Sequence, residues 1–391
     1  MKISVFSGAN DPSYALPMVK SLLDKELLVD FIGNDQMQVA EVFRHPNVNY
    51  LNFRGCQDES VIISKKIARI LLYYIRLIKY AFLTKTKIFH VLWLNKFELF
   101  DRTALNIYFR ILGKKIIFTA HNINQSQRDG NDNFLNKVTL WVHYHLMHHI
   151  FVHTNKMKEQ LIKEFNVKIK NITVIPFGLN TVIPQTKLSV QQAREKLGIQ
   201  SNQKPLLFFG QIAPYKGLHL FIKALYIAKK NFPDVCVIVA GKSKEGFGHY
   251  LQTVQELIRT LNLKDSVILH DHFISDEEVE IYFKAADALV LPYVVIFQSG
   301  VPFLGFNFGL PIIATDVGEL KDDVIDNVTG FICRPQDPED LAQKICDYFR
   351  SDLYNNLSES KKKIIEYARK THSWEIVAEK LTDVYNNLNP I

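Results

Sequence analysis

The sequence has few cysteines and no apolar run long enough to cross a bilayer. Its four cysteines, Cys56, Cys236, Cys333 and Cys346, lie far apart in 391 residues and show no CxxC spacing. This spacing argues against a disulfide framework and predicts reduced thiols in a cytoplasmic protein. No window of about 18 uncharged apolar residues occurs, so we expect no membrane span. Met1 leads directly into the strand-like run KISVFSG, and we therefore expect no signal peptide.

Acidic residues are scarce in the first half of the chain. Residues 1–180 carry 24 Lys+Arg against 14 Asp+Glu, a net of +10, whereas residues 181–391 carry 23 against 26, a net of −3. A basic half predicts an anionic partner, namely a nucleic acid, an anionic membrane surface or a phosphorylated ligand. The sequence has no zinc spacing, helix-turn-helix signature or aromatic RNA-binding strand, and it therefore does not favour nucleic acid.

No acidic residue at all occurs between Val61 and Phe97. At about 100° per residue, four basic side chains of the helix predicted here fall in one stripe, while the other faces are apolar and aromatic. These four are Lys65, Arg69, Arg76 and Lys79. Such a helix suits contact with an anionic membrane surface. The alternative is a core helix of the first domain whose only wet face is basic.

Short apolar runs of strand length alternate with segments of helical period. The strand-like runs are KISVFSG, LLVDFIG, KIFHVLWL, KKIIFTAHN, HHIFVHT and ITVIPFG, and then PLLFFG, VCVIVAG, SVILHDHF, ALVLPY, PIIATDVG and GFICRP. A looser segment, Asn180–Lys204, separates the two sets and contains one short helix that Ser189 caps. Alternation of strand and helix predicts parallel sheets with helices on both faces. A chain of 391 residues also exceeds one ordinary core.

We therefore expect an α/β protein with two doubly wound, Rossmann-like domains that face each other across a central cleft. The first domain comprises residues 1–180 and the second comprises residues 181–370. A C-terminal helix at about 371–391, with Ser373 as its N-cap, is expected to pack back on the first domain. Ligands of such folds bind beyond the carboxyl ends of the strands.

A stretch almost free of charge follows one strand of the second domain. From Val294 to Val317 the only charged residue is Asp316. Ser299 is the predicted N-cap of a helix from Gly300 to Phe308, and Pro302 leaves the N–H groups of Gly300 and Val301 as a free pair. Such a turn can hold an anion by backbone and helix dipole alone. Its alternative is an ordinary helix with a serine cap.

A lysine in a second turn strengthens the case for an anion. The run FFGQIAPYKGLHLFIKAL contains a strand at Pro205–Phe209, Gly210, and a helix that opens near Gly217 with Lys216 at its start. A cation beside the positive end of a helix is unfavourable unless an anion is also present. The alternative is a solvated surface lysine.

These motifs together resemble the second domain of family 4 retaining glycosyltransferases. The resemblance is carried by FFGQIAPYKGLHLFIKAL, AADALVLPY, QSG, GLPIIATDVGEL and TGFICRPQDPEDLAQKI, and less specifically by TAHNI, FVHTNKMKEQLIKEFNV and VIPFGLN. It implies the GT-B fold and a metal-independent, cofactor-free transfer of a sugar from a nucleotide diphosphate sugar. The acceptor is then a glycan or a lipid-linked glycan, and the setting is the assembly of a surface polysaccharide, in the cytoplasm or peripherally on the inner face of the membrane.

The resemblance also implies roles for individual residues. Lys216 and His121 would be catalytic, with Lys216 on the donor diphosphate and His121 beside the transferred sugar. Other residues would bind the donor, and these are Gly8, Ala9, Asn10, Asn122, Gln211, Phe273, Ile274, Gln298, Ser299, Gly300 and Val301. Because the diphosphate leaving group helps to deprotonate the acceptor in this family, the main task of the protein would be to stabilise a leaving dianion.

Several positions depart from the pattern of the family. Ile296 and Leu304 stand where many members carry two glutamates, Gln211 replaces an arginine and Phe177 replaces a histidine. Loss of the carboxylate that grips the ribose costs about 2–3 kcal/mol of donor binding. We interpret the QSG turn as the mark of a subclass, and two alternatives stay open, a degenerate binding protein and a nucleotide-sugar epimerase. Phosphorolysis would need pyridoxal phosphate, for which no motif is present.

A metal site is the remaining interpretation of the histidine-rich run HYHLMHHIFVH. His145 and His149 are four residues apart, a spacing that places two ligands on one face of a helix. No carboxylate lies nearby in the sequence, so we expect no metal and a polar helix end before the strand at Ile150.

Overall fold

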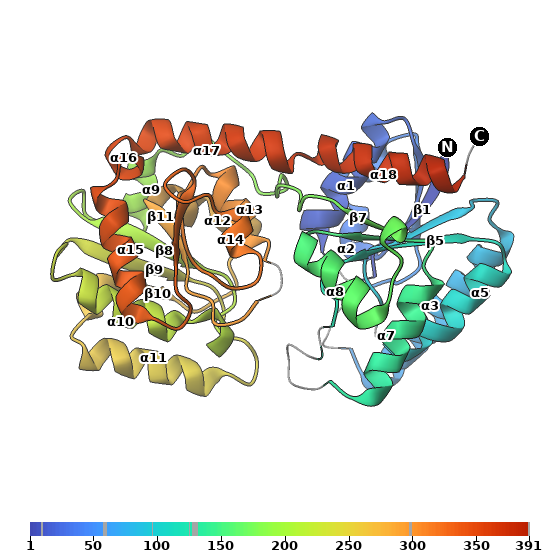
Figure 1. The fold of residues 1–391 in the computed structure, drawn as a ribbon, viewed down its shortest axis with the longest axis horizontal. Helices are drawn as coiled ribbons and strands as arrows, with labels where there is room; N and C mark the ends of the chain where they lie inside the picture. The colour runs from blue at the N-terminus through green and yellow to red at the C-terminus, as the bar shows by residue number, and fades with distance from the viewer. Residues whose placement is uncertain are drawn as a thin grey trace. The chain divides into compact units, whose positions relative to one another are not determined.

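The chain folds into two compact units, seen in a computed structural model that describes residues 1–8, 11–57, 61–95, 97–124, 126, 132–296 and 299–389. The first unit comprises Met1–Gly178 and Ser373–Ile391, and the second comprises Leu179–His372 (Figure 1). The C-terminal segment therefore belongs to the first unit.

The first unit is built on a seven-stranded sheet with the order β3-β2-β1-β4-β5-β6-β7. All of its neighbouring strands pair in parallel. The strands are β1 (Lys2–Phe6), β2 (Leu28–Gly33), β3 (Val48–Asn52), β4 (Ile88–Val91), β5 (Lys115–Ala120), β6 (His149–Val152) and β7 (Ile172–Val174). Strand β3 was not predicted, because its sequence Val-Asn-Tyr-Leu-Asn contains no continuous apolar run. Its side chains are only partly buried or exposed.

Helices cover both faces of this sheet. They are α1 (Pro12–Asp24), α2 (Asp35–Gln38), η1 (Glu41–Arg44), α3 (Ile63–Leu83), α4 (Glu98–Phe100), η2 (Asp101–Leu105), α5 (Asn106–Ile111), α7 (Phe134–Leu146), α8 (Asn155–Phe165), η3 (Ile169–Asn171) and α18 (Trp374–Leu388). Alternate residues of β1 enter opposite cores, because side chains of a strand point to its two faces in turn. Val5 packs with α1 and α18, whereas Phe6 packs with α3, α5 and α7.

The second unit repeats the plan with a six-stranded parallel sheet of order β10-β9-β8-β11-β12-β13. Its strands are β8 (Lys204–Phe209), β9 (Val235–Ala240), β10 (Val267–His270), β11 (Ala288–Leu291), β12 (Ile312–Thr315) and β13 (Gly330–Cys333). Its helices are α9 (Val190–Lys196), η4 (Pro214–Lys216), α10 (Leu218–Ala228), α11 (Gly248–Thr260), η5 (Lys264–Ser266), α12 (Asp276–Ala285), α13 (Val301–Asn307), α14 (Leu320–Asp323), α15 (Pro338–Arg350), α16 (Asp352–Asn355) and α17 (Leu357–His372).

Both sheets confirm the predicted fold class, an α/β protein with two doubly wound Rossmann-like domains, the GT-B fold. Two predicted caps also form: the Ser189 side chain accepts from the backbone of Gln192, and the Ser373 side chain accepts from that of Ile376. None of the helices in the described ranges has the length and apolar character that crossing a bilayer requires.

Strand order reverses at one point in each sheet. In the first unit this point lies between β1 and β4, and in the second it lies between β8 and β11. Loops that follow such strands diverge to opposite faces and leave a crevice at the carboxyl edge of the sheet. Gly8 follows β1, and Gly210 follows β8, so the turns singled out in the sequence lie at these two points.

Candidate active site

Two glycines shape the turn at the switch point of the second unit. Gly210 and Gly217 have φ angles of +102° and +70°, a region that side chains disfavour. A Cβ on Gly217 would lie 1.8 Å from the carbonyl oxygen of Pro292, the first residue after β11. The turn thus packs directly on the segment that follows β11, and the N–H of Val294 donates to the carbonyl of Tyr215 at 2.8 Å.

Lys216 is buried in this turn. It lies on the short 3₁₀ segment η4, one residue before the glycine that precedes helix α10, and only 7 % of it is exposed. Its Nζ lies 3.9 Å from the centre of the Tyr293 ring, a cation–π contact. The interpretation as a solvated surface lysine is therefore wrong.

The surroundings of the Lys216 ammonium group are aromatic. The Tyr215 ring centre is 5.8 Å from Nζ, and in the described part of the chain no carboxylate forms an ion pair with it. A buried cation without a counter-charge is costly, and an anionic ligand would remove that cost. The Tyr293 hydroxyl is in turn 3.5 Å from the Ser299 Oγ, which links the lysine to the second predicted turn.

The turn at Ser299 differs in detail from its prediction. Helix α13 begins at Val301 with Gly300 as its cap residue, and it ends at Asn307, one residue early. The N–H of Val301 donates to Ser299 Oγ at 3.3 Å, so Gly300 and Val301 are not a pair of free donors. Gly300 itself is exposed.

The other expected donor residues of the second unit have mixed environments. Gln211 and Phe273 are exposed, Phe273 by 76 %, whereas Ile274 is buried. Ile296 and Leu304, the two departures from the glutamate pattern of the resembled family, are both buried. Three expected site residues, Ala9, Asn10 and Gln298, lie outside the described residues.

In the first unit, Gly8 and His121 meet at the switch point through Trp93. Gly8 has φ +57°, and a Cβ there would lie 1.9 Å from the Trp93 carbonyl oxygen. The Trp93 ring stacks on His121 with centroids 4.3 Å apart and an interplanar angle of 5°. Gly8 and His121, which the sequence assigned separately to the donor and to the transferred sugar, therefore both contact Trp93. The sequence missed Trp93, whose signal was an aromatic residue two positions after the buried strand β4.

His121 is held neutral. Its Nδ1 lies 3.3 Å from Nε2 of His153, and its Nε2 is buried with no hydrogen-bond partner among the described residues. Burial lowers the pKa of His121 well below its ordinary value, and the neighbouring His153 and His90 add to this. Phe177, the replacement for the family histidine, packs 5.0 Å from the His153 ring.

His121 and Asn122 line a cavity of about 250 Å³ in the first unit. It lies over the ends of β4 and β5. Its other lining residues are Leu92, Trp93, Leu94, Glu98, Arg102, Phe118, Thr119, Ile123, Leu140, His143 and Tyr144. A neutral imidazole in such a cavity can exchange hydrogen bonds with a neutral polar ligand, and it places no positive charge there.

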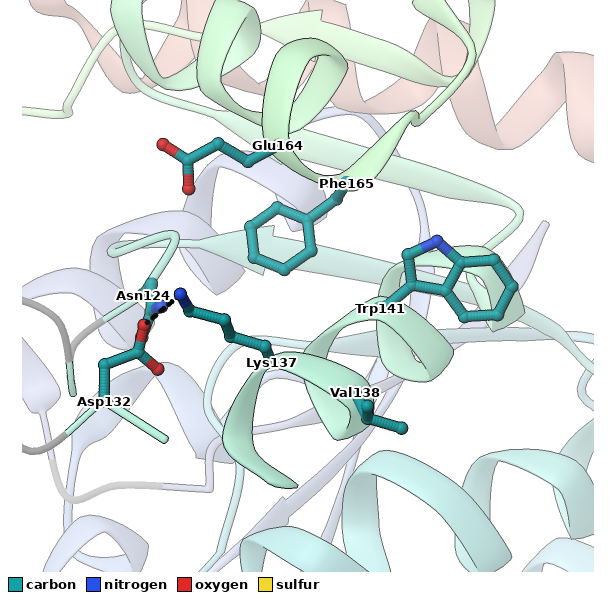
Figure 2. A pocket seen from close by; sticks show the side chains of 7 residues that line it. All are labelled: Asn124, Asp132, Lys137, Val138, Trp141, Glu164 and Phe165. Carbon is teal, nitrogen blue, oxygen red and sulfur yellow. Dashed lines mark ion pairs between the residues drawn. The ribbon is translucent and has the colours of Figure 1, made fainter. Parts of the chain in front are cut away.

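A larger cavity of about 510 Å³ lies beside α7 and α8. Figure 2 shows Phe165 in the middle of its wall, the Lys137–Asp132 ion pair on one side and Trp141 on the other. Asn124, Val138 and Glu164 complete the lining. Aromatic surface with carboxylate and amide groups around it is a combination suited to a ligand that is apolar on its faces and rich in hydroxyls at its edges.

The two histidines considered as metal ligands do not share a helix. His145 is on α7, where its ring stacks on Trp141, whereas His149 lies in strand β6 and its Nε2 is 2.9 Å from Thr173 Oγ1. The common-face geometry is therefore wrong. Among the described residues no group of three or more metal-binding side chains occurs.

The second unit matches a protein-family model described as glycosyl transferases group 1, over residues 189–371. D-inositol 3-phosphate glycosyltransferase of Corynebacterium diphtheriae is 26 % identical over 245 residues, which cover 61 % of this chain and 56 % of that one. Alpha-monoglucosyldiacylglycerol synthase of Streptococcus pneumoniae is 28 % identical over 180 residues, 45 % of this chain and 39 % of that one. These matches support a group 1 glycosyltransferase.

The likeness in structure extends over both units. HepE of Anabaena, solved in complex with UDP and glucose, superposes with a TM-score of 0.76 at 16 % identity and covers 99 % of this chain and 100 % of that one. At that identity the likeness shows the GT-B fold alone. The chain spans about half the length of the curated relatives that it matches in sequence, 58 %, 56 % and 48 % for the first three.

Proposed function

We propose that the protein is a glycosyltransferase that moves a sugar from a nucleotide diphosphate sugar to a glycan or lipid-linked acceptor, with retention. The observation that carries the proposal is Lys216, a buried ammonium group with aromatic neighbours and no carboxylate partner among the described residues. It lies at the switch point of a parallel sheet, where such folds bind ligands. The match of residues 189–371 to group 1 glycosyl transferases supports the same conclusion.

In this proposal Lys216 holds the donor diphosphate. As the bond between sugar and phosphate breaks, negative charge grows on the leaving diphosphate, and a fixed cation in a dry site stabilises that charge without reorganisation. Gly300, an exposed residue, would add its backbone N–H as a donor, while Ser299 links this turn to Tyr293. Lys216 and the backbone N–H would together neutralise the diphosphate, and this is why we expect transfer without a metal ion.

On the same proposal, Gly8, His121 and Asn122 serve the transferred sugar. Because burial keeps His121 neutral, it would exchange a hydrogen bond with a sugar hydroxyl and would not donate a proton to the leaving group. Gln211, Phe273 and the buried Ile274 would then bind the nucleoside. HepE was solved with UDP and glucose, which supports a uridine nucleotide as the first donor to test.

The larger cavity of the first unit is the proposed acceptor site. Trp141 and Phe165 offer aromatic surface to the faces of a sugar, and Asp132 and Glu164 offer carboxylates to its hydroxyls. The name of the Streptococcus pneumoniae relative describes a glucosylated diacylglycerol, which supports a lipid-linked acceptor. A role in surface polysaccharide assembly, in the cytoplasm, follows from the family resemblance.

A pair of lysine variants tests the proposal. Lys216→Ala should weaken UDP binding about a hundredfold, because the diphosphate loses a buried charge partner. It should also lower the rate of UDP release from UDP-glucose in the presence of acceptor by at least about a hundredfold, the scale of losing one donor to the transition state. Lys230→Ala is the matched control, because Lys230 also lies over a tyrosine ring, that of Tyr226 at 5.6 Å, but on the surface. Equal UDP binding by both variants and the parent would remove Lys216 from the site.

The products distinguish the alternatives. A transferase gives nucleoside diphosphate and a glycosylated acceptor, an epimerase gives a changed sugar from the donor alone, and a degenerate binding protein gives neither. Donor binding without any turnover over a panel of nucleotide sugars and lipid-linked acceptors would favour the last of these.

A further inference from the structure

Helix α3 exposes most of its large aliphatic side chains. Only Tyr73, Tyr74, Leu77 and Ala81 of this 21-residue helix are buried. The exposed aliphatic and aromatic residues are Ile63, Ile67, Leu71, Leu72, Ile75, Ile78, Phe82 and Leu83. The alternative raised by the sequence, a core helix whose only wet face is basic, is therefore wrong.

Most of these residues form one stripe. Ile67, Leu71, Ile75, Ile78 and Phe82 fall within about a quarter turn of one another at about 100° per residue. The stripe lies between the face that packs on the sheet and the basic stripe predicted from the sequence.

The neighbouring segment continues the apolar surface. α4, η2 and α5 follow one another without a break, and Leu99, Ile107 and Ile111 are exposed at four- and eight-residue spacings along them. The Tyr108 hydroxyl donates to the Ile78 carbonyl, and the Tyr74 ring contacts that of Phe100, so the two segments lie side by side (Figure 1). Helix α3 and the α4–α5 segment pack into the same core on one face of the sheet. The exposed stripe of each therefore points away from that core.

Of the four basic side chains predicted to form one stripe, two border this surface and two turn away from it. Arg69 bonds the Cys56 carbonyl, and Arg76 reaches the Asn52 and Phe53 carbonyls at 3.5 Å, so both guanidinium groups turn towards the loop after β3. Lys65 and Lys79 are exposed beside the apolar stripe. Lys85 and Lys87 lie exposed just beyond the end of the helix.

We propose that the outer face of α3 and α4–α5 is a membrane-docking surface, in which the apolar stripe enters the interfacial region of an anionic lipid bilayer and Lys65 and Lys79 bind its headgroups. A contiguous exposed apolar surface marks an interaction site. Residues 61–113 contain ten Lys+Arg and two Asp+Glu, and this charge complements an anionic leaflet. The helix lies in the interface plane and does not span it.

This surface does not depend on the proposed transferase activity. The basic stripe alone would predict binding by charge, which salt reverses. The structure assigns the larger part of the binding to burial of aliphatic side chains, which salt does not reverse.

The test compares two triple variants of the full chain by co-sedimentation with vesicles. Ile67→Gln/Leu71→Gln/Ile75→Gln removes the centre of the stripe, where exposure is 52–62 %. Val39→Gln/Val190→Gln/Val328→Gln is the control, because these valines are also exposed, at 45–78 %, but lie elsewhere. The vesicles contain phosphatidylcholine with or without about a third of phosphatidylglycerol.

The stripe variant should partition onto the anionic vesicles at least a hundredfold more weakly than the parent, at low and at high salt. Each large aliphatic group moved out of water contributes about a tenfold factor. The control should match the parent. A Lys65→Gln/Lys79→Gln variant should bind the anionic vesicles more weakly than the parent at low salt, by about tenfold, and should match the parent on pure phosphatidylcholine.

Two outcomes would overturn the proposal. The first is equal vesicle binding by the parent and the stripe variant. The second is a parent protein that does not bind vesicles and is dimeric, while the stripe variant is monomeric. This outcome would assign the surface to a second copy of the chain. UDP binding, measured on the same variants without vesicles, should be unchanged, and it separates failure at this surface from failure of the proposed function.

Discussion

Gly217 offers the sharpest test of how the second unit positions Lys216. Gly217 and Gly198 share a φ of +70°, but their surroundings differ. A Cβ on Gly217 would lie 1.8 Å from the Pro292 carbonyl oxygen, whereas nothing lies within 4 Å of a Cβ on Gly198. The pair Gly217→Ala and Gly198→Ala therefore separates the cost of the backbone conformation from the cost of the contact.

Gly217→Ala and Gly198→Ala have the same cost of backbone conformation. An L-residue in the left-handed region loses about 1–2 kcal/mol, and this is the whole expected loss of unfolding free energy for Gly198→Ala. In Gly217→Ala the Pro292 carbonyl must also move by more than about 1 Å to reach an ordinary contact, an overpacking cost of about 1–3 kcal/mol. The next residues resist the shift, because the Tyr293 carbonyl accepts from Thr315 Oγ1 at 2.7 Å. We expect a total of about 2–5 kcal/mol.

Urea unfolding of the full chain measures the two losses, and hydrogen exchange locates them. In Gly217→Ala the amides of Leu220 and Phe221, which donate to the Gly217 carbonyl, should exchange faster. UDP affinity should fall at least tenfold, because Lys216 moves with the turn, and should be unchanged in Gly198→Ala. Equal destabilisation by the two substitutions would refute the claim that close approach to Pro292 requires glycine at position 217.

Three further predictions concern other parts of the molecule. Burial lowers the pKa of His90 and His143 to about 3, below the unfolded value, so their contribution to stability is complete above about pH 6.5 and is lost as the pH falls towards 3. Together they should cost about 3 kcal/mol per pH unit below pH 6.5, and His148, His149 and His153, whose pKa burial also lowers, add to this loss. Urea unfolding at pH 7.0 and at about one unit below pH 6.5 measures the sum, and a flat profile would contradict this. Arg194→Met should lower the free energy of unfolding by about 3–5 kcal/mol, because the buried Asp287 loses its partner at 2.6 Å, and Arg194→Met/Asp287→Asn should recover part of that loss in thermal unfolding. Trp141→Ala should raise the KM for acceptor at least tenfold with unchanged UDP binding, and an unchanged KM would remove the larger cavity from acceptor binding.

The apolar strands were predictable because strands buried on both faces appear in the sequence as continuous runs. Twelve of the strands correspond to such runs, and only β3, at the edge of its sheet, does not. The glycines of the two switch points were also predictable, since a turn between strand and helix commonly requires positive φ. The cap residues Ser189 and Ser373 follow from local rules that need no tertiary contact.

The role of a charged side chain was harder to predict than its position in the chain. Lys216 was singled out for its place beside a glycine, but its burial on Tyr293 depends on β11 lying next to β8, a pairing of strands about eighty residues apart. Trp93 and His153 became partners of His121 for the same reason, because parallel neighbours bring the ends of distant strands together.

Helix α3 shows that the local sequence predicts a helix without determining which of its faces is buried. Its sequence specified a helix with one basic stripe and with other faces that are apolar and aromatic, and it did not specify which of these faces enters the core. A sheet contacts only one face of a helix that lies on it, and packing with β4 and α5 chose Tyr73, Tyr74 and Leu77 for that contact. Ile67, Leu71 and Ile75 lie outside that face of the helix and stay exposed.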